Sequence, residues 1–167
     1  MKTLTIGFSR PKKSTIFSRL IEYTDDTAYD HVYIKWNWAV INRDVIYQAS
    51  KFAVNFESNV TFDSHATTIE SYDMEISDEC HIDIIQFCMD NCNKPYSIRS
   101  LFGFALVKMC SKFGKKVHNP FPTYGASFVC SKIAAEVAAR AGIRIDADFD
   151  DIDPLDLNNI IKRSMGI

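Results

Sequence analysis

The sequence contains no apolar run long enough to cross a membrane. Every hydrophobic stretch is well short of the ~18 residues that a transmembrane helix needs. The N-terminus, Met1–Ile6, also lacks the apolar segment and the small-residue cleavage site of a secretory signal peptide. We therefore expect a soluble, cytoplasmic protein without a membrane span.

A strong excess of charge of either sign is also absent. The net charge is −2 at pH 7, which gives no reason to expect nucleic acid or an anionic membrane as a partner. The hydrophobic content of 47% is instead that of an ordinary globular core. No repeat, low-complexity tract or linker divides the chain, so we expect a single domain spanning residues 1–167.

The five cysteines include no CxxC pair, and their odd number favours reduced thiols over a disulfide framework. Cys80, Cys88 and Cys92 recur at helical spacing, and with His81 they raise a zinc site as an alternative to a face of buried thiols. The acidic stretch Asp146–Asp153 lacks the glycine and the terminal glutamate of an EF-hand loop. We expect neither a metal nor a cofactor.

Hydrophobic periodicity and turn residues predict a mixture of strands and helices. We expect extended chain at residues 4–8, 31–36, 45–49, 54–60 and 69–76. We expect helices at residues 14–24, 77–92, 97–113, 133–140 and 154–161. The fold class is therefore α+β, with a mostly antiparallel sheet packed by helices.

Cys130 lies in or beside the first turn of the helix that runs from Ile133 to Arg140 and stops at Gly142. Unpaired backbone N–H groups and the helix dipole favour an anion at this position. Such an environment lowers the pKa of a cysteine and makes it reactive. The alternative is that Cys130 is one more small buried hydrophobic residue.

A nucleophilic thiol needs a base, and the four histidines differ in how firmly they are held. His65 lies in a polar segment, His118 in a basic loop, and His81 in a helix. His31 opens a predicted strand directly after a polar loop, and a strand end holds a base more rigidly than a loop does. His31 is therefore the candidate base, and a strand-edge histidine without catalytic role is the alternative.

The strand His31–Ile34, followed by a hairpin to Val45–Ser50, resembles the catalytic-histidine hairpin of the NlpC-type cysteine peptidases. The order along this chain, histidine before cysteine, is similar to that of the circularly permuted papain-like branch, which includes the YiiX-like proteins, the lecithin:retinol acyltransferase relatives and a poxvirus family. The resemblance covers nearly the whole chain and continues at the segments Lys94–Tyr96, Phe128–Ser131, Gly142–Ile143 and Ile152–Leu157.

The resemblance implies a circularly permuted papain-like fold with Cys130 as nucleophile and His31 as base. Gln48 matches the third, polar member of the triad. Tyr96 matches a tyrosine that supplies a second oxyanion donor beside the Cys130 N–H, although a core tyrosine is the alternative.

The implied activity is hydrolysis of an amide or ester through an acyl-enzyme intermediate, as in a peptidase or amidase. The substrate class would be a peptide, a cell-wall peptide or a lipid amide or ester. Two alternatives stay open. One is a lipid acyltransferase or thioesterase of the same fold, and the other is a non-enzymatic binding or structural protein that retains the fold.

The sequence departs from the family pattern at three positions. Gln48 stands where relatives often have Glu or His, so the third residue has no charge, although its amide oxygen can still accept the imidazole N–H. We therefore expect Gln48→Glu to preserve or raise activity. Tyr33 replaces a glycine and is expected to narrow the cleft, and Lys132 replaces a common glutamate.

The basic residues 108–118 are interpreted as a solvated face, with a rim for an anionic substrate as the alternative.

Overall fold

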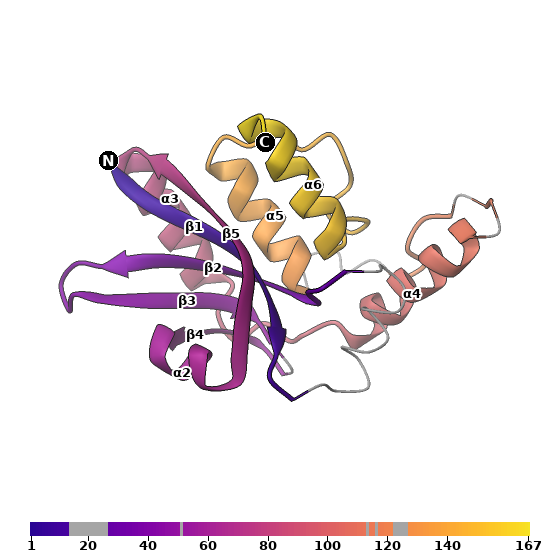
Figure 1. Ribbon diagram of the computed structural model, residues 1–167, viewed down its shortest axis with the longest axis horizontal. Helices are drawn as coiled ribbons and strands as arrows, with labels where there is room; N and C mark the ends of the chain where they lie inside the picture. The colour runs from indigo at the N-terminus through magenta and orange to yellow at the C-terminus, as the bar shows by residue number, and fades with distance from the viewer. Residues whose placement is uncertain (14–26, 51, 113, 116, 122–126) are drawn as a thin grey trace.

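The computed structural model of the chain describes residues 1–13, 27–50, 52–112, 114–115, 117–121 and 127–167. The helix predicted at residues 14–24 lies outside these ranges. The described residues form one antiparallel sheet with helices packed against it (Figure 1). The predicted α+β class is therefore confirmed.

The sheet has five strands in the order β4-β3-β2-β1-β5, and each strand is antiparallel to its neighbours. The strands are β1 (Lys2–Pro11), β2 (His31–Trp38), β3 (Arg43–Ala49), β4 (Val54–Ser58) and β5 (Ala66–Ile76). The strands predicted at residues 4–8, 31–36, 45–49 and 69–76 are confirmed, and each is longer in the structure than the sequence predicts.

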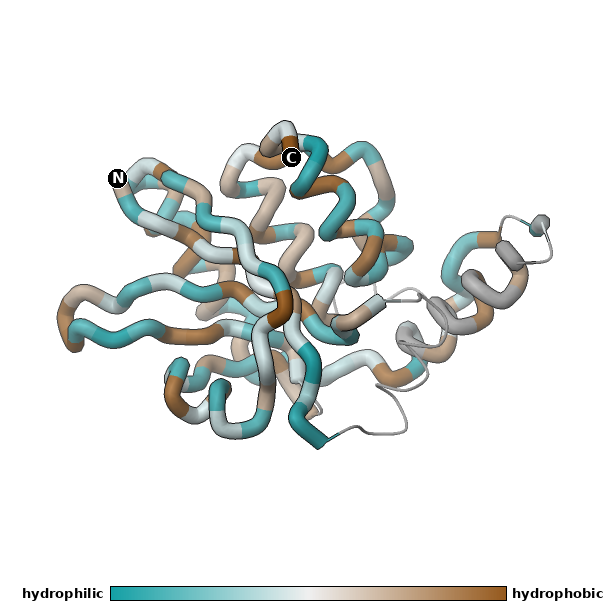
Figure 2. The backbone as a smooth tube through the Cα atoms, viewed as in Figure 1, coloured by the Kyte–Doolittle hydropathy of each residue, from teal (hydrophilic) through white to brown (hydrophobic). Residues whose placement is uncertain are grey.

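Three helices pack on one face of the sheet and form the main core. They are α3 (Asp78–Asp90), α5 (Cys130–Arg140) and α6 (Pro154–Met165), and Figure 1 shows α5 and α6 side by side. Ser77, the first residue of the helix predicted at residues 77–92, caps α3, because its hydroxyl accepts a hydrogen bond from the Cys80 N–H at 3.1 Å. Hydrophobic and hydrophilic segments alternate along the strands and along α5 and α6, as Figure 2 shows, which lets each element bury one side.

One helix was not predicted. The chain around Val60 was expected to be extended, but α2 (Asn59–His65) begins there, with the Ser58 hydroxyl accepting a hydrogen bond from the Thr61 N–H at 3.1 Å. The capping serine outweighs the β-propensity of a single valine, since it satisfies an N–H group that the first turn leaves free. Phe62 of α2 is buried in a second, smaller core on the opposite face of the sheet, with Tyr33, Ile46 and Ala66.

The remaining helix, α4 (Ile98–Lys112), matches the helix predicted at residues 97–113. Figure 1 shows α4 lying apart from the helices that cover the sheet. Across the described ranges, α4 included, no helix is both long enough and apolar enough to cross a bilayer.

Successive side chains of β2 and β3 point to opposite faces of the sheet, and this alternation determines which residues lie on each face. Val32 and Ile34 of β2 and Tyr47 of β3 point into the main core. His31, at the first position of β2, and Gln48, near the end of β3, therefore belong to the other face. These two polar side chains therefore lie on the face that carries α2, at the end of the sheet where β2 begins and β3 ends.

Candidate active site

Cys130 is the first residue of α5, as the sequence predicts. Val129 occupies the N-cap position, and it has no polar side chain to bind the free N–H groups of the first turn. The backbone N–H groups of Val32 in β2, of Ser131 and of Cys130 itself are near enough to the sulfur to oppose the rise in the pKa of its thiol. Backbone N–H groups in such a position favour a negative charge.

Burial outweighs these donors. Cys130 is only 4% exposed, and burial raises the pKa of its thiol to about 11 although the backbone donors act in the opposite direction. The expectation that the helix start lowers this pKa is therefore wrong. The physical reason is that loss of hydration disfavours the thiolate by more than the nearby N–H groups restore. Cys130 is a neutral thiol at pH 7.

His31 lies at the start of β2, and its Nε2 is 2.6 Å from Gln48 Oε1. Gln48 lies on the neighbouring strand, where the resemblance places the third member of the triad. Burial lowers the pKa of His31, although the hydrogen bond with Gln48 and the charges of Asp30 and Glu57 act against that shift. The imidazole is therefore neutral at pH 7, so one of its two ring nitrogens is free of hydrogen and can accept a proton.

The Cys130 sulfur is close to the backbone of Val32, the residue that follows His31. The pKa of its thiol also responds to the charge of Asp30, the residue before His31. The chain thus brings α5 and the start of β2 together, although they are far apart in the sequence.

Tyr96 also contacts the thiol of Cys130. Its hydroxyl is hydrogen-bonded to the Cys130 sulfur, and burial raises the pKa of Tyr96 well above its ordinary value, so it is a neutral donor. Backbone contacts fix this approach: Tyr96 forms a bridge with Phe128, and the Ser97 N–H donates to the Phe128 carbonyl at 2.9 Å. Phe128 is two residues before Cys130, so this bridge positions Tyr96 beside the helix start.

Asp30 is a member of the site that the sequence analysis missed. It is 7% exposed, and its negative charge raises the pKa of Cys130, of His31 and of Tyr96. The signal in the sequence was an acidic residue directly before the candidate base, at the end of a loop that was interpreted only as polar. A buried carboxylate here favours the protonated imidazole.

Glu57 is a second missed residue. Gln48 Nε2 donates a hydrogen bond to Glu57 Oε1, and the other carboxylate oxygen is 3.2 Å from His65 Nε2. The pairing of β3 with β4 places Glu57 opposite Ile46, on the same face as Gln48. The alternation of polar and apolar residues after Val54 was the signal that could have found it.

Tyr33, expected to narrow the cleft, is used for packing. Its ring lies over Gly7, where an added Cβ would be 2.1 Å from the tyrosine Cζ. Its hydroxyl is 2.8 Å from Thr68 Oγ1, and its ring centroid is 4.5 Å from that of Phe62. These contacts belong to the second core on the α2 face.

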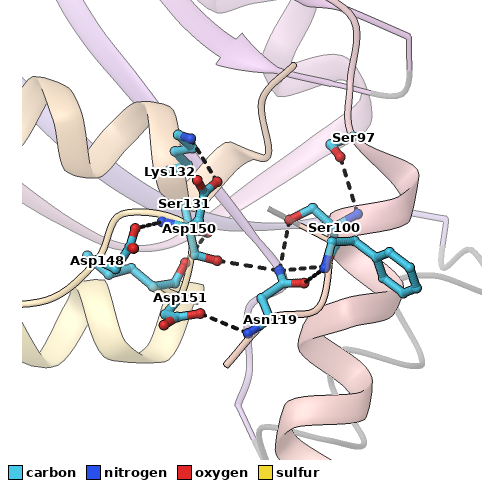
Figure 3. Close-up of polar contacts among 10 residues, drawn as sticks. Ser97, Ser100, Asn119, Ser131, Lys132, Asp148, Asp150 and Asp151 are labelled. Atoms are coloured by element: carbon cyan, nitrogen blue, oxygen red, sulfur yellow. Dashed lines mark hydrogen bonds and ion pairs between the residues drawn. The ribbon is translucent and has the colours of Figure 1, made fainter. Parts of the chain in front are cut away.

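A polar network fixes the start of α5 (Figure 3). Lys132 forms a salt bridge of 2.7 Å with Asp150, and the Ser131 hydroxyl donates to the Ile152 carbonyl at 2.6 Å. Asn119 joins the same region to α4, since its amide donates to the Ser100 hydroxyl at 3.0 Å. The loop before α6, the loop after α4 and the first turn of α5 are therefore held together.

The other candidate groups have structural contacts. Of the thiols on α3 and beside it, Cys88 is buried and its pKa is raised, mainly by burial. Among the residues that the structure describes, no cluster of three or more His, Cys, Asp or Glu side chains could hold a metal ion. His118 of the basic stretch lies 2.7 Å from Asp151 of the acidic stretch, so part of each stretch pairs with the other.

No protein-family model matches the chain, and no curated protein sequence is significantly similar to it. The site therefore has to be interpreted from its own residues.

Proposed function

We propose that the protein is a cysteine-dependent hydrolase of amides or esters, with a circularly permuted papain-like fold. Cys130 is the nucleophile, His31 the base, Gln48 the residue that orients the base, and Tyr96 a donor to the oxyanion. The observation that carries the proposal is the position of the Cys130 sulfur. It lies at the backbone N–H of Val32, the residue after His31, while the Nε2 of that histidine is 2.6 Å from Gln48 Oε1.

The neutral state of both partners defines the first step. The thiol proton moves to Nδ1 of His31 while the sulfur forms a bond to the carbonyl carbon. The negative charge that develops on the carbonyl oxygen is stabilised by donors already present, namely the backbone N–H of Cys130 and the hydroxyl of Tyr96.

The second step returns the proton. His31 protonates the leaving amine or alcohol as the C–N or C–O bond breaks, which leaves an acyl-thioester on Cys130. Water then attacks the thioester, His31 accepts a proton from the water, and that proton passes to the departing sulfur. The carboxylate of Asp30 supports each state in which the imidazole is positively charged.

A nitrophenyl ester tests the proposal because acylation and release of nitrophenolate are observed separately. We expect an initial burst of nitrophenolate and an acyl group located on Cys130 by peptide mass spectrometry. Cys130→Ala and His31→Ala should abolish the burst, whereas Cys110→Ser, which removes another thiol, should retain it. Acylation of another residue, or an unchanged burst in His31→Ala, would refute the proposal.

One observation favours a second function, that of a non-enzymatic binding or structural protein which retains the fold. The Cys130 thiol is almost fully buried, and its raised pKa keeps it protonated. In that case no burst would appear, and Cys130→Ala would lower the free energy of unfolding, since it leaves the Tyr96 hydroxyl and the Val32 N–H without the buried sulfur they contact.

A further inference from the structure

We propose that Glu57 is a positioning residue for His31 and that it acts through the side-chain amide of Gln48. The inference rests on the proposed role of His31 as the base. It identifies the residue that sets which ring nitrogen of that base carries the hydrogen.

The geometry of the three side chains carries the inference. Gln48 is buried, its Nε2 donates to Glu57 Oε1, and its Oε1 is 2.6 Å from His31 Nε2. Both ends of the amide are therefore engaged, one on each side. An amide with a single partner could rotate and present either its oxygen or its nitrogen, and Gln48 has no such freedom.

The hydrogen-bonding capacity of each group then fixes the proton on the imidazole. A carboxylate oxygen only accepts, so the Gln48 NH₂ group must face Glu57, and the amide oxygen must face His31. Because an amide oxygen also only accepts, His31 Nε2 must carry the hydrogen. In the neutral ring Nδ1 is then the unprotonated nitrogen, the one that can accept a proton from a thiol.

Glu57 is itself held in place. Its second oxygen is 3.2 Å from Nε2 of His65 in α2, so both oxygens have partners. Its side chain is only 16% exposed, whereas that of His65 is 53% exposed. The chain of contacts thus begins at the imidazole of His31 and ends at the more exposed His65, and Glu57 is its one carboxylate.

The variant Glu57→Gln tests this role because it keeps the shape of the side chain and removes the obligatory acceptor. The readout is the ¹⁵N chemical shift of the two ring nitrogens of His31, which reports the tautomer without any substrate. The matched control is Glu75→Gln in β5, which also removes a carboxylate that accepts a side-chain hydrogen bond, from Thr3. Glu75 pairs with Thr3 while His31 pairs with Ser9, so the control lies roughly 20 Å away along β1.

We expect a hydrogen on Nε2 of His31 in the parent protein and in the control, and a mixture of the two tautomers in Glu57→Gln. Alkylation of Cys130 by iodoacetamide at neutral pH should slow by about tenfold in that variant. This is less than the roughly 10²–10⁴-fold that a positioned base contributes, because Gln48 remains beside the imidazole.

The double variant Q48E/E57Q provides a rescue. The carboxylate now lies beside His31 and accepts from Nε2, and the new glutamine donates to it from the position of Glu57. The parental tautomer and alkylation rate should return. If Glu57→Gln does not fold, Glu57→Asp carries the test, since its shorter side chain withdraws the acceptor from the Gln48 amide, and an unchanged tautomer in it would overturn the inference.

An unchanged tautomer in folded Glu57→Gln would likewise overturn the inference. A changed tautomer with an unchanged alkylation rate would support the positioning role while refuting the proposed function, because His31 would then not act on the thiol. Failure of the positioning role of Glu57 and failure of the proposed function therefore give different experimental results.

Discussion

Lys132 and Asp150 form a salt bridge of 2.7 Å between side chains that are only 7% and 15% exposed. Lys132 is in the first turn of α5, two residues after Cys130, and Asp150 lies in the loop before α6 (Figure 3). The pair therefore connects the helix start that carries the thiol to the loop that packs beside it.

Breaking this pair should be costly. Lys132→Ala removes the ammonium and leaves a largely buried carboxylate, so we expect the free energy of unfolding to fall by about 3 kcal/mol. The double variant Lys132→Met with Asp150→Asn should lose less, because neither charge remains. Urea denaturation checks both, and an equal loss in the two variants would contradict the explanation.

The reactivity of Cys130 should rise steeply with pH. Because its thiol pKa is raised to about 11, the thiolate is a minor species at neutral pH and increases about tenfold for each pH unit until that value is approached. Alkylation by iodoacetamide, located by mass spectrometry at pH 7, 8, 9 and 10, should show this increase at Cys130. A rate that is already constant between pH 7 and 8 would mean that the thiolate forms far more readily than its burial implies.

The structure changes what is expected of Gln48→Glu. The new carboxylate would face Glu57, and two carboxylates within hydrogen-bonding distance cannot both ionise without a penalty, which raises the pKa of one. A folded-state pKa raised above the unfolded value costs stability as pH rises through that interval, so the variant should melt below the parent at pH 8 and closer to it at pH 5.

Thermal denaturation at the two pH values checks this expectation. The double variant Q48E/E57Q serves as the control, since it has the same new glutamate but no facing carboxylate, and its melting temperature should differ little from that of the parent. If the single variant melts like the parent at both pH values, the contact between residues 48 and 57 does not carry the energy assigned to it.

The carboxylate of Glu70 contributes stability that increases with pH, which is the opposite of the effect expected for the Gln48→Glu variant. Glu70 of β5 accepts hydrogen bonds from Tyr72 at 2.6 Å and Asn158 at 2.8 Å, and it lies 2.9 Å from the Lys162 ammonium. These partners lower the pKa of Glu70 from its ordinary value near 4.5 to about 2. The stabilisation is thus present above pH 4.5 and is lost as pH falls from 4.5 to 2.

We therefore expect Glu70→Gln to lower the free energy of unfolding at pH 7 by about 1 kcal/mol, a modest value because the side chain is 36% exposed and solvent screens the pair. The difference from the parent should vanish near pH 2. Denaturant titrations at both pH values measure it, and a difference that persists at pH 2 would show that packing, rather than charge, is responsible.

Local sequence patterns were sufficient for most of the sheet and for the ends of the helices. Ser77 caps α3 and Pro154 begins α6 because each residue satisfies a requirement of a helix's first turn, which neighbouring residues alone determine. Val60 shows the limit of this reasoning. Its β-propensity predicted a strand, but the cap at Ser58 and the burial of Phe62 in the second core produce α2 instead.

The site could be predicted only where its chemistry is local. The helix start predicted donors near Cys130, and these are present, but the direction of its pKa shift depends on how deeply the helix is buried, which no local pattern gives. Asp30 and Glu57 could not be predicted from the sequence for a related reason. Each matters through a partner on another element, and strand register and loop closure decide such partners.

The order of these residues along the chain has a consequence for synthesis. His31 and Gln48 belong to a hairpin that is translated before α5, the helix that Cys130 begins. A ribosome that adds about 5–20 residues per second takes roughly 5–20 s to travel from the codon for His31 to that for Cys130. Throughout that interval the nascent chain carries the imidazole and its amide partner without Cys130, so the proposed constellation cannot form until α5 has been synthesised.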